Sequence, residues 1–150
     1  MFLDWLNTSY FWNSSLFYRY SLLIPITLLY AGILGLLSVL LANQVLSVRI
    51  KGEKEEKWRA YATERVQANF VENVPLTLIL LYLFEISVSS KVAVHVFGSG
   101  LVLCRLLHAW GMSKYKGANY PRLIGAQGTF LLLSIISMAC IYQFFITFVS

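Results

Sequence analysis

Glu72 and Arg105 are the charged residues with the clearest chemical meaning, because each interrupts a stretch apolar enough to cross a membrane. An ionisable side chain at the centre of a bilayer costs roughly 2.5–3.5 kcal/mol even on the mildest scale. Such a residue is therefore expected either to form a buried ion pair or to bind a ligand. Two hypotheses stay open at this stage: a salt bridge between Glu72 and Arg105, or a polar ligand site.

Other polar residues recur around Glu72 at helical spacing. At about 100° per residue, four of them share one stripe of a helix: Arg65, Asn69, Glu72 and Asn73. Gln67 lies about 200° from Arg65 and so points toward a different neighbour. Since polar stripes cannot face lipid, this helix must face other helices or a water-accessible cavity. Polar groups in two directions are expected where a helix lies at a boundary between subunits.

The next apolar stretch adds Arg105 and His108, which are three residues apart and share a helix face. Guanidinium groups bind carboxylates through paired hydrogen bonds, a carboxylate can accept from an ammonium, and carboxamides can bind peptide groups. A small zwitterionic peptide with excess negative charge, such as glutathione, matches this set. A histidine such as His108 is, on its own, more often a core or interfacial residue than a base.

These residues must be positioned by membrane helices. The 150 residues are 58% hydrophobic and 13% charged, whereas a soluble domain is usually about a quarter charged. A bilayer core needs roughly 20 apolar residues, and four segments meet that length, near residues 22–48, 66–86, 92–110 and 124–148. The sequence predicts an all-α membrane protein, a single domain over 1–150 formed by a bundle of four transmembrane helices. Residues 1–20, rich in aromatic side chains, are expected to lie at the membrane interface.

The distribution of Lys and Arg predicts the orientation. Nine of them fall on the face with the first and third connections, against Arg19 and Lys91 on the other. The positive-inside rule then places both termini outside the cytoplasm in a multi-pass integral membrane protein, in the inner membrane if the source is bacterial. The net charge of +5 thus reflects topology, and no nucleic-acid partner is expected.

Smaller features carry further expectations. Cys104 and Cys140 fall inside predicted spans and suit neither a disulfide framework nor a metal site. Pro25 is expected to kink the first helix near its outer end. Gly32 and Gly35, with Ser38, form a small-residue face suited to close helix packing.

The chain also resembles the MAPEG superfamily, the membrane-associated proteins in eicosanoid and glutathione metabolism, and in particular its bacterial members. The similarity runs from about Leu40 to Phe145 and rests on three motifs. These are Arg65-x-Gln67-x-Asn69-x-x-Glu72-x-x-Pro75, Arg105-Leu106-Leu107-His108-x-x-Gly111, and Arg122-x-x-Gly125-x-x-x-Thr129.

The resemblance implies a homotrimer that binds glutathione between subunits on the cytoplasmic side. Arg65, Asn69 and Glu72 would contact the peptide from one subunit, and Gln67 would reach it from the next. Asn73, Arg105 and His108 complete the expected ligand set. Arg122 falls where the synthases of the superfamily place the arginine that stabilises the glutathione thiolate, and a nearby guanidinium lowers a thiol's pKa.

Some positions depart from the pattern of the superfamily. Asn73, His108 and Met112 replace tyrosines that line the synthase pocket, and Gln44 stands where many members carry an arginine. The sequence is therefore consistent with two functions. The first is a glutathione-dependent enzyme that conjugates glutathione to a hydrophobic electrophile or reduces a lipid hydroperoxide. The second is a non-catalytic membrane protein that binds lipids or partner helices on the same fold.

Overall fold

The computed structural model describes residues 24–88, 90–117 and 119–149, so the aromatic segment 1–20 lies outside the described residues. It contains four long helices: α2 (Thr27–Lys51), α3 (Lys57–Ser87), α4 (Lys91–Lys114) and α5 (Tyr120–Val149). A short 3-10 turn, η3 (Gly52–Lys54), joins α2 to α3. All four helices are long and apolar enough to cross a membrane. The expectation of an all-α bundle of four membrane helices is confirmed.

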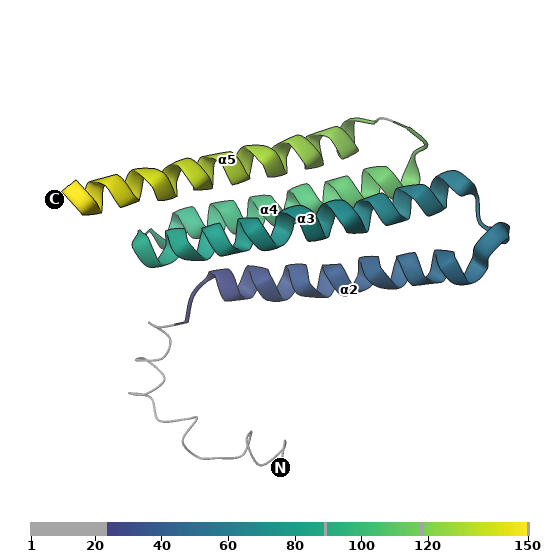
Figure 1. The fold of residues 1–150 in the computed structure, drawn as a ribbon, viewed down its shortest axis with the longest axis horizontal. Coiled ribbons are helices and arrows are strands. Elements are labelled where there is room, and N and C mark those ends of the chain that lie inside the picture. The colour runs from purple at the N-terminus through teal and green to yellow at the C-terminus, as the bar shows by residue number, and fades with distance from the viewer. Residues whose placement is uncertain (1–23, 89, 118, 150) are drawn as a thin grey trace, which may run out of the picture.

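The helices form an antiparallel bundle with α3 and α4 in the middle (Figure 1). α2 packs mainly on α3, while α5 packs on α4 and also reaches α3. The α2–α3 and α4–α5 connections lie at one end, here called the basic end, and the α3–α4 connection lies at the opposite end (Figure 1). The predicted site residues lie on the two central helices, α3 and α4, and on the start of α5.

The core follows the helical repeat of α3. Its buried side chains recur every three or four residues: Ala62, Val66, Phe70, Val74, Thr77, Leu81 and Phe84. Leu34 of α2, Leu101 of α4 and Ile136 of α5 pack from the surrounding helices, each with 1% exposure or less. Most other apolar side chains of α2 and α5 are exposed, as expected of surfaces that face lipid or another subunit.

One local expectation was wrong. Pro25 precedes the helix, which begins at Thr27, so it introduces no kink into α2. Gly32 and Gly35 are exposed, and a Cβ at either position would meet nothing within 4 Å among the described residues. Their small-residue face therefore makes no close helix contact among the described residues of one subunit, and its use in packing between subunits stays a prediction.

The opposite end contains a polar cluster that the sequence analysis missed. Glu85 of α3 accepts hydrogen bonds from the Thr27 nitrogen at 2.9 Å and from the Thr27 hydroxyl at 2.7 Å, and also from the Ile26 nitrogen. A carboxylate there satisfies the free N–H groups of the first turn of α2 and suits the positive end of the helix dipole. The Tyr30 hydroxyl lies 2.8 Å from His95 Nδ1 and joins α2 to α4 nearby.

Candidate functional site

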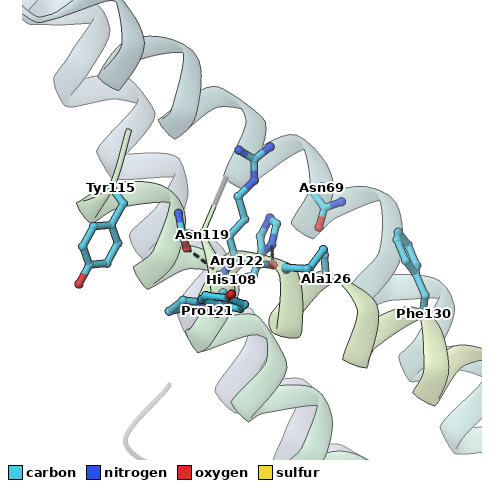
Figure 2. Close-up of a pocket in the computed structure, with 10 residues that line it drawn as sticks. Asn69, His108, Tyr115, Asn119, Pro121, Arg122, Ala126 and Phe130 are labelled. Carbon is cyan, nitrogen blue, oxygen red and sulfur yellow. Dashed lines mark hydrogen bonds between the residues drawn. The ribbon is translucent and has the colours of Figure 1, made fainter. Parts of the chain in front are cut away.

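A groove of about 960 Å³ opens at the basic end, between α3, α4 and the first turns of α5 (Figure 2). Its polar lining comes from Asn69 of α3, His108 of α4, Asn119 and Arg122. Tyr115, Tyr120, Pro121, Leu123, Ala126 and Phe130 complete the wall. A volume of this size lies in the range of ordinary small-molecule sites, roughly 300–1,000 Å³. We call it the basic-end groove.

Arg105 contacts Asn69 of this groove and has an exposed fraction of only 2%. One terminal nitrogen donates to Asn69 Oδ1 at 2.7 Å, and the other donates to the Gly125 carbonyl oxygen at 3.1 Å and to the Thr129 hydroxyl. Its Nε has no partner among the described residues. The guanidinium thus joins α3, α4 and α5, and neutral oxygens rather than a carboxylate surround its charge.

The salt-bridge hypothesis for Glu72 and Arg105 is wrong within the subunit. Glu72 is exposed, whereas Arg105 is buried against Asn69 and α5. In the part of the chain that the structure describes, carboxylates pair with cations only at or near the α2–α3 connection. There Glu64 pairs with Arg49, and Glu55 pairs with Lys51 and Arg59.

His108 is buried, and its Nδ1 lies 3.1 Å from the carbonyl oxygen of Arg122. A carbonyl oxygen can only accept, so Nδ1 must carry the proton. In the neutral imidazole, Nε2 is then left as the acceptor. His108 thus both ties α4 to α5 and offers a proton-accepting atom beside the groove.

The start of α5 sets the place of Arg122. Asn119 Oδ1 accepts from the Arg122 nitrogen at 3.0 Å, which is the hydrogen bond of an N-cap, and its Nδ2 donates to the Gly111 carbonyl at 3.0 Å. A Cβ at Gly111 would lie 2.5 Å from the Arg122 nitrogen, so a glycine is needed there. The sequence analysis missed Asn119, although an Asn two residues before Pro121 is a recognisable helix start.

Gly125 allows the closest contact between α4 and α5. A Cβ at this position would lie 2.5 Å from both the Cys104 carbonyl oxygen and the His108 nitrogen. The approach brings the Gly125 carbonyl and Thr129 to Arg105, and the Arg122 carbonyl to His108. The motif that begins at Arg105 on α4 and the motif that begins at Arg122 on α5 therefore contact each other directly.

The remaining predicted site residues lie on α3. Arg65 and Glu72 are exposed about one turn before and after Asn69, and neither has a hydrogen bond or ion pair among the described residues. Gln67 is half-buried on another face, with a buried Oε1 that has no partner among those residues. Asn73 turns its amide to the Asn69 carbonyl at 2.9 Å.

The departures from the superfamily pattern differ in their place in the structure. His108 lines the basic-end groove, whereas Met112 lies in the core with an exposed fraction of 3%. Asn73 bonds to its own helix, and Gln44 is exposed on α2. Tyr115, Tyr120 and Phe130, which sequence reasoning did not single out, provide aromatic rings along the groove instead.

Four membrane-crossing helices with a polar groove at one end define an integral, multi-pass membrane protein with a site among its helices. The model of the MAPEG family matches residues 27–142, and the chain belongs to that family. Comparison with curated proteins gave no match, and comparison with solved structures gave none either. The family includes glutathione-dependent transferases and peroxidases as well as non-catalytic members.

Proposed function

We propose that this protein is a glutathione-dependent membrane enzyme, which conjugates glutathione to a hydrophobic electrophile or reduces a lipid hydroperoxide. One observation carries the proposal: Arg122, His108 and Asn69 meet around a single groove of about 960 Å³ (Figure 2). Arg65 and Glu72 are exposed on the same face of α3 as Asn69. The groove and the neighbouring face of α3 together provide cations, a carboxylate and an amide, as an anionic zwitterionic peptide requires.

The donor set fits glutathione by its chemistry. The guanidinium of Arg65 suits a carboxylate, and the carboxylate of Glu72 suits the ammonium. The amide of Asn69 suits a peptide or carboxylate oxygen. Glutathione would supply a thiol as nucleophile or reductant. Arg122, half-buried at the wall of the groove, would favour the thiolate by its charge, and His108 Nε2 would be placed to accept a proton.

A homotrimer is part of the proposal. Arg65, Glu72 and Gln67 lack polar partners in the described part of the subunit, and Gln67 points away from the face of α3 that Arg65 and Glu72 share. Polar groups at this depth require partners or water. A site between subunits would supply partners for all three, and the exposed apolar faces of α2 and α5 offer area for such contacts.

We also propose that the basic end faces the cytoplasm and that both termini lie on the other side. The excess of Lys and Arg at the connections of the basic end supports this orientation. The second substrate would then reach the groove from the membrane, along the wall formed by Leu123, Ala126 and Phe130. Such apolar side chains suit an acyl chain and exclude water from its reactive carbon.

Glutathione titration of the detergent-solubilised protein tests the proposal. Wild type should bind glutathione in a calorimeter, and the ultraviolet difference spectrum should reveal thiolate at neutral pH. Arg122→Lys keeps the charge but loses the planar fork, so it should retain binding and lower the thiolate fraction. Arg49→Lys makes the same change on an exposed arginine of α2 and serves as the control.

The second candidate function is a non-catalytic binding protein, which the replacement of a pocket tyrosine by His108 favours. The same spectra separate the two functions. Bound glutathione without thiolate at neutral pH would remove the conjugating activity and leave a binding protein. Absence of glutathione binding would refute both the enzyme and the glutathione site.

A further inference from the structure

The contact between Arg105 and Asn69 determines which end of the Asn69 carboxamide can face a ligand. The guanidinium donates to Asn69 Oδ1 at 2.7 Å, and a guanidinium has donors only. Turning the amide over would place its NH₂ group against another N–H donor. Because Arg105 is 98% buried, that arrangement would leave donors without acceptors away from water, which is costly.

Arg105 is itself held from α5, so it cannot follow a rotation of the amide. The Thr129 hydroxyl donates its proton to the Gly125 carbonyl at 2.9 Å, which leaves a lone pair of the same oxygen for Arg105. The second terminal nitrogen of Arg105 also donates to the Gly125 carbonyl. The chain of hydrogen bonds therefore has a single direction, from Arg105 outward to oxygens on α3 and α5.

We propose that Arg105 is a positioning residue of the basic-end groove. By holding the amide oxygen of Asn69, it leaves the Asn69 NH₂ group as the one offered to a ligand. This point of the groove then selects a hydrogen-bond acceptor, either a carboxylate or a peptide carbonyl, and rejects an ammonium. The identity of the ligand as glutathione rests on the proposed function, whereas the orientation of the amide does not.

Asn69→Asp tests the selection directly. The new carboxylate keeps an oxygen for Arg105 but turns a second, charged acceptor toward the groove. We expect a melting temperature at or above that of wild type and an affinity for glutathione lower by about tenfold or more. Asn43→Asp adds the same charge on the exposed face of α2 and should leave binding unchanged. Wild-type affinity in Asn69→Asp would overturn the proposal.

Double-variant binding tests whether Arg105 acts through Asn69. Arg105→Gln should weaken glutathione binding by roughly tenfold, and Arg105→Lys, which still only donates, should recover most of the loss. In an Asn69→Ala background, Arg105→Gln should change the affinity less than about twofold. Independent losses that multiply would show that Arg105 acts on the ligand by another route and would refute the positioning role.

Stability measurements keep the inference distinct from the proposed function. If wild type binds no glutathione, the proposed function fails, but the contact can still be tested by melting without ligand. Asn69→Asp should then be more stable than Asn69→Ala, and Arg105→Gln should abolish that difference. Equal stability of the two Asn69 variants with Arg105 intact would overturn the contact itself.

Discussion

Gly125→Ala is the sharpest test of how α4 and α5 form the groove. The added Cβ would lie 2.5 Å from the Cys104 carbonyl oxygen and from the His108 nitrogen, and 2.8 Å from His108 Cβ. The two close atoms belong to the α4 backbone, so no side chain can rotate away to relieve the overlap. To restore ordinary contact, the helices must separate by roughly 1 Å in a closely packed interior.

The separation should cost about 1–3 kcal/mol of unfolding free energy, the usual range for overpacking. It should also lengthen the hydrogen bonds from Arg105 to Gly125 and from His108 to Arg122. Gly100→Ala is the matched control on the same helix pair, because its Cβ would meet only the flexible end of Leu132 at 3.4 Å. Alanine is the better helix former by about 0.5–1 kcal/mol, so this control should be neutral or slightly stabilised.

Unfolding of both variants in mixed detergent micelles, followed by circular dichroism, measures the difference. The reasoning requires Gly125→Ala to be the less stable variant by at least about 1 kcal/mol. Equal stability of the two variants would mean that α4 and α5 do not approach as closely as Gly125 indicates.

Three further predictions follow from exposure and charge. Glu72→Gln should barely change the melting temperature without ligand, because Glu72 is exposed and has no partner among the described residues. The same change should reduce the rise in melting temperature that glutathione causes. A large loss of stability without ligand would contradict this prediction. An introduced Lys54→Cys should react with an impermeant reagent only after cells are permeabilised, and labelling of intact cells would reverse the orientation. The Lys51 ammonium donates to Glu55 at 2.9 Å and lowers the pKa of that carboxyl below its ordinary 4.5. The ion pair therefore stabilises the fold fully above the ordinary pKa, and this stabilisation is lost as the pH falls through the pKa of the folded state. Melts between about pH 3 and pH 7 should therefore show an acid-induced loss that is smaller in Glu55→Gln.

Much of the fold could be predicted because it depends on composition and length. Four apolar stretches of about 20 residues can satisfy their backbone in a bilayer only as helices, so the number and class of the elements followed directly. The helix ends were less predictable. α3 begins at Lys57, well before the predicted span near 66–86, because its first turns are polar and lie beyond the apolar stretch.

Asn69, His108 and Arg122, which line the basic-end groove, were visible in the sequence, since charged and amide side chains are rare in such stretches. Glu85 was overlooked because its role depends on Thr27, almost 60 residues away in the chain. Tyr115, Asn119 and Tyr120 were missed because they lie in or beside a connection, where helical spacing gives no information.

The sequence by itself determined that Arg105 must have polar partners, because a guanidinium among apolar residues cannot remain without them. Only the tertiary structure decided which partners those are. Glu72 and Asn69 are three residues apart on the same helix, and periodicity does not tell which of them turns inward. The rotation of α3 places Asn69 toward Arg105, and the absence of a side chain at Gly125 lets α5 approach closely enough to supply the other two oxygens. Helix rotation and the distance between helices arise from packing of the whole bundle. The sequence of one helix therefore does not determine either of them.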